Sequence, residues 1–82
     1  MNEEEKKYYV FETAVANGKQ ATATTIKNNW EEALMLFHQI RASCLANKAV
    51  TYSLTILMDE WGNISQKESY VRQQEEENNG ND

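Results

Sequence analysis

Histidine and cysteine, the residues most often used as proton carrier and nucleophile, are scarce in this chain. His38 is the only histidine and Cys44 the only cysteine among 82 residues. Six helical positions turn two side chains by about 240°, so these two cannot form a Cys–His pair within one chain. Acidic pairs occur only as sequence neighbours, Glu31-Glu32 and Asp59-Glu60, at an expected helix start and an expected turn. We therefore predict that the protein is not an enzyme.

Motifs for metals, cofactors and phosphate groups are also missing from the sequence. One cysteine and one histidine do not make a zinc motif, and one cysteine forms no internal disulfide. The glycines Gly18, Gly62 and Gly80 are isolated, so the chain has no glycine-rich phosphate loop. We expect no cofactor and no bound metal.

The net charge of -5 resides at the two ends of the chain. Residues 73–82 contribute -4 and residues 1–7 contribute -1, whereas six acidic and six basic residues cancel between Tyr8 and Arg72. We predict a charged extension over residues 1–7, one domain over residues 8–72 and a disordered acidic tail over residues 73–82. A neutral body lacks the basic stripe that binds phosphates, which argues against nucleic-acid binding.

The hydropathy pattern indicates a cytoplasmic protein. No run approaches the roughly 18 apolar residues of a membrane span, and the first seven residues are acidic, unlike a signal peptide. We therefore expect no membrane association.

The first half of the sequence predicts a hairpin followed by a helix. Residues 8–16 and 19–27 are strand-like and flank Asn17-Gly18, the dipeptide typical of a type I′ turn. This register sets Phe11 opposite Thr24 and gathers four apolar residues on one face, namely Tyr9, Phe11, Val15 and Ile26.

The helix is expected to run from Trp30 to Leu45 or Ala46. Asn29 is placed to cap it, Glu32 follows three positions later, and Asn47 fits a left-handed C-terminal cap. One apolar stripe should pack on the sheet, and it consists of Trp30, Ala33, Leu34, Phe37, Ile40 and Cys44.

Two further strands complete a ββαββ order in an α+β fold. Residues 49–61 alternate with period two and are the most apolar strand, whereas residues 64–72 are polar and suit a sheet edge. This contrast favours an antiparallel sheet of order 2-1-3-4, with 2-1-4-3 as the alternative, and the single helix on one face.

A sheet covered on one side leaves its other side free for a partner. We assign to that open side a set of small or apolar, uncharged interface candidates: Tyr8, Val10, Ala14, Ala21, Ala23, Thr51, Ser53, Thr55 and Leu57. Burial of this set in a homo-oligomer, most simply a dimer, would also support the small core.

Three segments resemble short uncharacterised proteins carried by phages and mobile elements of Gram-positive gut bacteria. The segments are YVFETAV at 9–15, EEALMLFHQIRAS at 31–43 and LMDEWGN at 57–63. The resemblance implies a small non-enzymatic protein that binds and blocks or sequesters something, including components of host defence.

Two functions follow as hypotheses. The first is a non-catalytic protein-binding module that self-associates and acts by occupying a partner. The alternative is a protein that sequesters a small nucleotide-like ligand between protomers, because aromatic rings stack on bases and guanidinium groups pair with anions. The candidate ligand contacts are Tyr8, Tyr9, Arg41, Trp61 and Arg72.

Overall fold

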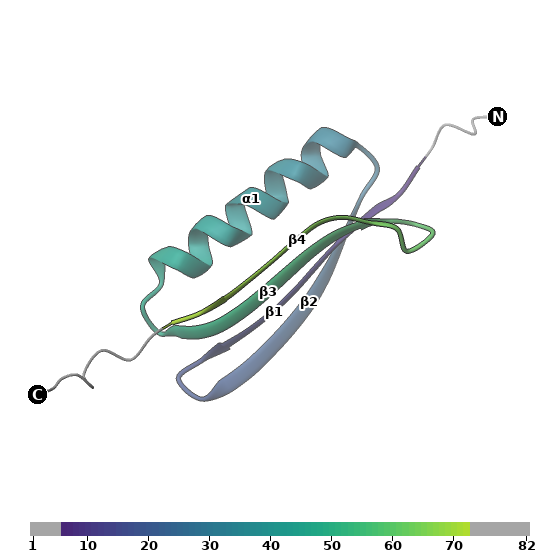
Figure 1. Ribbon diagram of the computed structural model, residues 1–82. Coiled ribbons are helices and arrows are strands. Elements are labelled where there is room, and N and C mark those ends of the chain that lie inside the picture. Colours follow the sequence, from purple (N-terminus) through teal and green to yellow (C-terminus); the bar gives the residue numbers. More distant parts are fainter. Residues whose placement is uncertain (1–5, 73–82) are drawn as a thin grey trace, which may run out of the picture.

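The computed structural model describes residues 6–72, so the predicted acidic tail and most of the N-terminal extension lie outside the described residues. The predicted order of elements is confirmed (Figure 1). The elements are β1 (Tyr8–Ala16), β2 (Lys19–Lys27), α1 (Trp30–Ala46), β3 (Val50–Asp59) and β4 (Ile64–Val71).

The first hairpin has the predicted turn and register. Asn17 and Gly18 have φ angles of 55° and 78°, the positive values that a type I′ turn requires at both central positions. All nine residues of β1 pair with β2 without a shift, and Phe11 lies opposite Thr24 as predicted.

The helix begins where predicted and ends at the predicted residue with a different cap. The Asn29 side chain accepts a 3.0 Å hydrogen bond from the Glu32 backbone N–H. Asn47 is extended, with φ of -89°, so the expected left-handed cap is wrong. Its backbone N–H donates to the Ser43 carbonyl, and its side chain accepts from the Ala49 N–H, so Asn47 leads the chain directly into β3.

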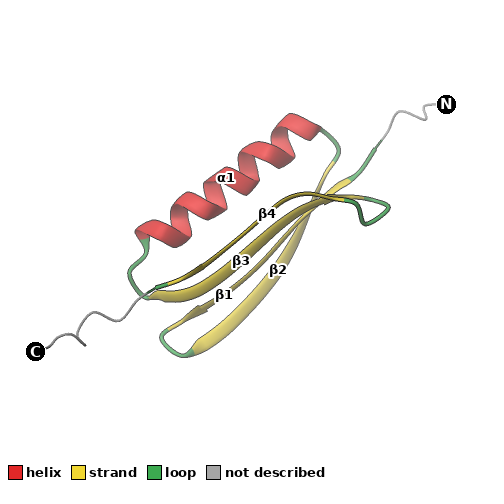
Figure 2. Cartoon of the chain, in the orientation of Figure 1, coloured by secondary structure: helices red, strands yellow, loops and turns green. Residues whose placement is uncertain are grey.

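The sheet has the order β2-β1-β3-β4 and is antiparallel throughout, which confirms the favoured topology. The helix runs along one side of this sheet, as the red ribbon in Figure 2 shows. Buried Ala33, Phe37 and Ile40 pack there against Val10 and Leu57 to form the core. Three of the six residues in the predicted helix stripe are therefore fully part of the core.

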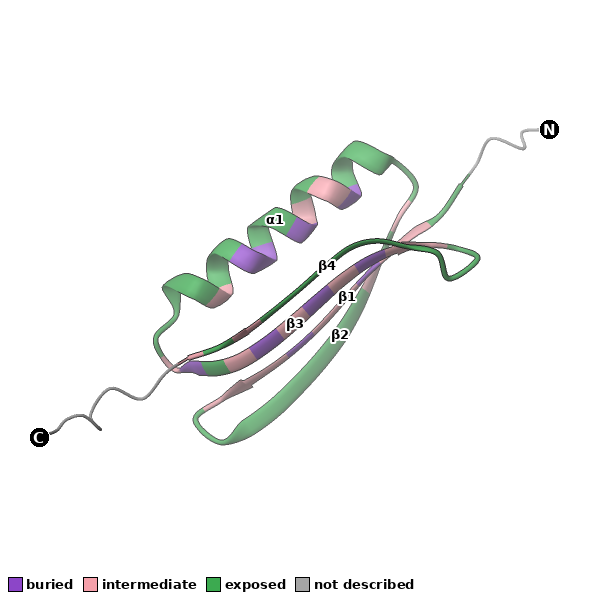
Figure 3. Ribbon diagram, in the orientation of Figure 1, coloured by how far each residue is buried: buried purple, intermediate pink, exposed green. Residues whose placement is uncertain are grey.

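The helix covers the side of the sheet that we expected to be open, so that assignment is wrong. Val10, Ser53, Thr55 and Leu57 are each 0% exposed. Buried and half-buried residues alternate along β3 from Ser53 to Met58 (Figure 3). Of the buried ones, Ser53 and Thr55 accept hydrogen bonds from Arg41 of α1. The other members of the interface set are half-buried or exposed around this covered side: Tyr8, Ala14, Ala21, Ala23 and Thr51.

The handedness of one connection accounts for this reversal. β2 and β3 both run antiparallel to β1, so they are parallel to each other and α1 is a crossover between them. Such crossovers are right-handed in about 98% of cases. In a two-residue hairpin, Ala16 and Lys19 form a hydrogen-bonded pair. The backbone N–H and C=O groups of the even-numbered β1 residues therefore point toward β2. The chirality of L-residues then places these even-numbered side chains on the face that a right-handed crossover covers.

Candidate functional site

The side of the sheet opposite α1 is the candidate functional surface, and we call it the open face. It consists of sixteen side chains that the strand register arranges in rows across β2, β1, β3 and β4. The rows are Ile26, Tyr9, Met58 and Ile64; Thr24, Phe11, Ile56 and Lys67; Thr22, Thr13, Leu54 and Ser69; and Gln20, Val15, Tyr52 and Val71.

The inner strands make the centre of the open face apolar, and the edge strands give it a more polar rim. Every open-face residue of β1 and β3 except Thr13 is aromatic or aliphatic. The edge strands contribute hydroxyl and amide groups together with Lys67, which is the only charged residue among the sixteen. An apolar centre inside a polar rim is the usual anatomy of a protein–protein interface.

The apolar residues of the open face remain accessible to water. The inner-strand members other than Thr13 are half-buried, because neighbouring strands flank them within the sheet. On the edge strands Ile26 is 56% exposed, Ile64 is 54% exposed and Val71 is 67% exposed. A continuous apolar patch of this kind on a small protein commonly marks a contact surface.

A polar network holds part of the open face in a fixed arrangement near the first hairpin. The Thr13 hydroxyl lies 2.9 Å from the Thr22 hydroxyl and accepts a 3.0 Å hydrogen bond from the Gln20 side-chain amide. Thr13 is itself only 7% exposed. These bonds pair the Thr13 hydroxyl, which is the one polar group at the centre of the face. A partner could therefore cover Thr13 without leaving an unpaired hydroxyl.

The side covered by the helix is the more polar of the two. Beneath α1 lie Ser53, Thr55 and the guanidinium group of Arg41, and the carboxylate of Glu68 borders them. An antiparallel sheet with one covered face normally places its apolar residues on that face and its polar residues in water. This sheet has the opposite distribution.

Arg41, a predicted ligand contact, is used inside the protein. Its Nη1 donates 3.0 Å hydrogen bonds to both Ser53 Oγ and Thr55 Oγ1. Its Nε lies 3.6 Å from Glu68 Oε1, and its side chain is 8% exposed while that of Glu68 is 62% exposed. The guanidinium group therefore stabilises the contact of α1 with β3 and is not free to bind an anion.

Arg72, another predicted ligand contact, connects the end of β4 to the end of the helix. Its Nε donates to the Val50 carbonyl at 2.9 Å, and its Nη2 donates to the carbonyls of Leu45 and Asn47 at 3.2 and 3.1 Å. The last turn of α1 has no basic residue of its own. Arg72 supplies the positive charge that the carbonyl end of a helix favours.

The structure does not gather the remaining ligand candidates into one pocket. Tyr8 contacts Trp30 at the start of the helix, with ring centroids 5.6 Å apart, whereas Tyr9 belongs to the open face. Trp61 lies in the turn between β3 and β4 and is 79% exposed. The five candidate ligand contacts are thus spread over both faces and over several elements.

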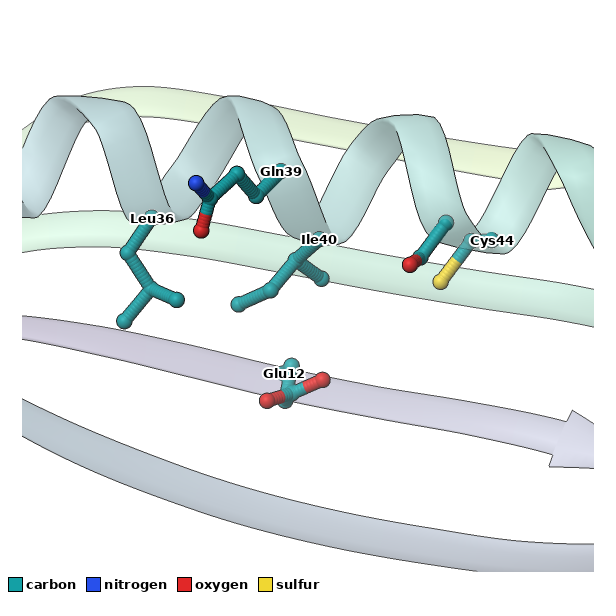
Figure 4. A pocket seen from close by; sticks show the side chains of 6 residues that line it. Glu12, Leu36, Gln39, Ile40 and Cys44 are labelled. Atoms are coloured by element: carbon teal, nitrogen blue, oxygen red, sulfur yellow. The ribbon is translucent and has the colours of Figure 1, made fainter.

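A shallow hollow of about 270 Å³ lies beside the helix (Figure 4). Its lining residues are Glu12, Leu36, Gln39, Ile40, Ser43 and Cys44, none of which was a predicted ligand contact. His38 is exposed and does not line it, so it offers no base for the Cys44 thiol. In residues 6–72 no three His, Cys, Asp or Glu side chains are grouped as metal ligands would be.

A comparison of the chain with protein-family models, with curated proteins and with solved structures found no match. No helix between residues 6 and 72 has the length and apolar character needed to cross a membrane.

Proposed function

We propose that the protein is a non-catalytic protein-binding module that self-associates through its open face. The observation that carries this proposal is the distribution of polarity in the sheet. The covered side contains a guanidinium group and two buried hydroxyls, whereas the open face carries one charged residue among sixteen. Apolar side chains selected for a water-exposed face would oppose solubility, but they favour association when a second surface covers them.

The alternative function, sequestration of a nucleotide-like ligand, receives no support from the geometry. Arg41 and Arg72 are both engaged in internal hydrogen bonds, and the candidate aromatic residues lie on different sides of the sheet. The kind of biological partner comes from the sequence resemblance alone. It favours a host component, including one of a defence system, that the module blocks by occupying it.

Sedimentation velocity of the full chain over a range of concentrations tests the proposal. We expect the wild-type protein to be a dimer and the Leu54→Arg variant to be a monomer, because the new guanidinium would lose its hydration at the centre of the interface. Met35→Arg is the matched control, since Met35 is a large apolar residue that is 59% exposed on the helix. That variant should remain a dimer.

A circular dichroism spectrum unchanged from wild type establishes that each variant is folded. A wild-type chain that stays monomeric at high micromolar concentration contradicts self-association. Equal loss of the dimer in both variants would move the interface away from the open face.

A further inference from the structure

The geometry of the open face points to one specific arrangement of two copies. We propose that they pack open face against open face about a two-fold axis that runs nearly along the strands, so that β2 of each copy lies over β4 of the other. This inference rests on the proposed self-association and adds its symmetry and its contacts.

Symmetry leaves two arrangements for such a pair. A two-fold axis that relates two facing sheets must lie in the plane between them. Sheets packed in the aligned manner cross at about 30°, which places this axis within roughly 15° of the strand direction or of its perpendicular. An axis along the strands sets each row of side chains over the same row of the partner, and it sets β2 over the partner's β4. A perpendicular axis instead sets β4 over the partner's β4 and β2 over the partner's β2.

The axis along the strands sets unlike inner strands over each other. β1 of one copy then lies over β3 of the other, so Tyr9 faces the partner's Met58 and Phe11 faces the partner's Ile56. The smaller end of β1, Thr13 and Val15, meets the larger side chains at the same level of β3, Leu54 and Tyr52. Large residues opposite small ones allow facing sheets to interdigitate.

The rim gives the argument for choosing between the two axes. Lys67 is the one charged residue of the open face, so a dimer contains two of them. A perpendicular axis brings both ammonium groups to the same edge, where they repel each other. An axis along the strands separates them by the width of the sheet, about 14 Å between outer strands, and sets each over the hydroxyl of the partner's Thr24.

The size of the open face is sufficient for such a pair. Four strands and four rows span about 19 by 27 Å, or roughly 500 Å² of flat area on each copy. The two copies together would bury about 1,000 Å², without counting the additional surface of protruding side chains. This area reaches the lower limit of a specific interface. The face is therefore large enough to be covered by a second copy without a further partner.

Single-cysteine variants and a bismaleimide cross-linker that spans about 10 Å, the distance between packed sheets, test this arrangement. In a Cys44→Ser background, Thr22→Cys and Ser69→Cys place one thiol on each edge strand, in the same row, and leave Lys67 in place. The axis along the strands sets Ser69 over the partner's Thr22. We therefore expect cross-linked dimers when the two variants are mixed, and little or none from either variant alone.

The possible failures are distinguishable. Cross-linking of the Ser69→Cys variant with itself would overturn the axis in favour of the perpendicular one. Dimers in sedimentation that no combination cross-links would overturn the face-to-face contact while leaving self-association intact, as pairing between edge strands would do. A monomeric protein would overturn the proposed function and this inference together.

Discussion

The buried Arg41 network gives the sharpest test of how α1 is held on the sheet. Arg41→Leu removes the donor of both hydrogen bonds to Ser53 Oγ and Thr55 Oγ1, and these hydroxyls lie on residues that are 0% exposed. Leaving a buried polar group unpaired destabilises a protein by about 1–3 kcal/mol, so two such groups amount to roughly 2–6 kcal/mol. The variant no longer buries a charged guanidinium group, which offsets part of this cost. We therefore expect the unfolding free energy to fall by about 3 kcal/mol.

A triple variant separates the cost of unpaired hydroxyls from the loss of packing. Arg41→Leu combined with Ser53→Ala and Thr55→Val removes the charge and both hydroxyls while approximately conserving the volume at position 55. Replacing a whole buried polar network by apolar groups is often neutral or stabilising, so we expect this variant to lie within about 1 kcal/mol of wild type. The ion pair with Glu68 contributes little to either difference, because the Glu68 side chain is 62% exposed.

Urea unfolding followed by tryptophan fluorescence measures these free energies. The protein concentration is held constant, because association shifts apparent stability. Lys48→Leu serves as the control, since Lys48 is an exposed cation next to β3 and its loss should change stability by about 0.5 kcal/mol or less. An Arg41→Leu variant as stable as this control, or a triple variant that recovers none of the lost stability, would contradict the role of Arg41 in holding α1 on the sheet.

Three further predictions concern the ends of the elements. Arg72→Met should lower the unfolding free energy by about 2 kcal/mol in the same urea assay, because the carbonyls of Val50, Leu45 and Asn47 lose the hydrogen bonds that the guanidinium group donates; an unchanged midpoint would show that the contact is dispensable. Gly18→Ala should lower the unfolding free energy by about 1 kcal/mol, because alanine disfavours the φ of 78° at this position, whereas its Cβ would meet nothing within 4 Å. A loss below a few tenths of a kcal/mol would contradict this prediction. The pKa of Asp59 lies below 3.8 because the Asn63 side chain and backbone, and then the Trp61 N–H, donate to its carboxylate. The ionised carboxylate therefore stabilises the fold above pH 3.8, and this stabilisation is lost as the pH falls below that value. In thermal unfolding, the Asp59→Asn variant should lose less stability than wild type between neutral and acid pH. The same pH dependence in both proteins would contradict this prediction.

Local signals predicted the elements and the strand order. Asn17-Gly18 fixed the register of the first hairpin, since only a few residue types accept positive φ at both turn positions. The apolar character of β3 and the polar character of β4 placed these strands at the centre and the edge of the sheet. These predictions succeeded because each depends on interactions between residues close in sequence or on simple burial.

The roles of the two arginines could not be predicted from sequence. Arg41 lies on the flank of the helix stripe, and its burial depends on the hydroxyls that β3 presents to it. Arg72 reaches carbonyls of residues that are 22 to 27 positions earlier in the chain. Both contacts arise only after the sheet and helix have assembled, so the sequence pattern offered the two side chains as free ligand contacts.

The placement of the open face was predictable, although hydrophobicity alone predicted it wrongly. The apolar set of Tyr9, Phe11, Val15 and Ile26 was identified correctly as one face and was expected beneath the helix. The order β2-β1-β3 makes α1 a crossover, and a right-handed crossover covers the other face whatever the polarity of its residues. The hairpin register and the predicted strand order together carried enough information to make that assignment.

The same constraint explains why the apolar face points to association. Because backbone chirality fixes the position of α1, substitutions in the strands cannot move the helix from one face to the other. An apolar residue on the open face therefore gains nothing from the described chain's own helix, and each one lowers solubility unless another surface covers it. Inner-strand positions that are aromatic or aliphatic in seven of eight cases are difficult to reconcile with a face that remains in water. The proposed self-association would cover them, because a second copy of the chain would supply a surface of the same size and character.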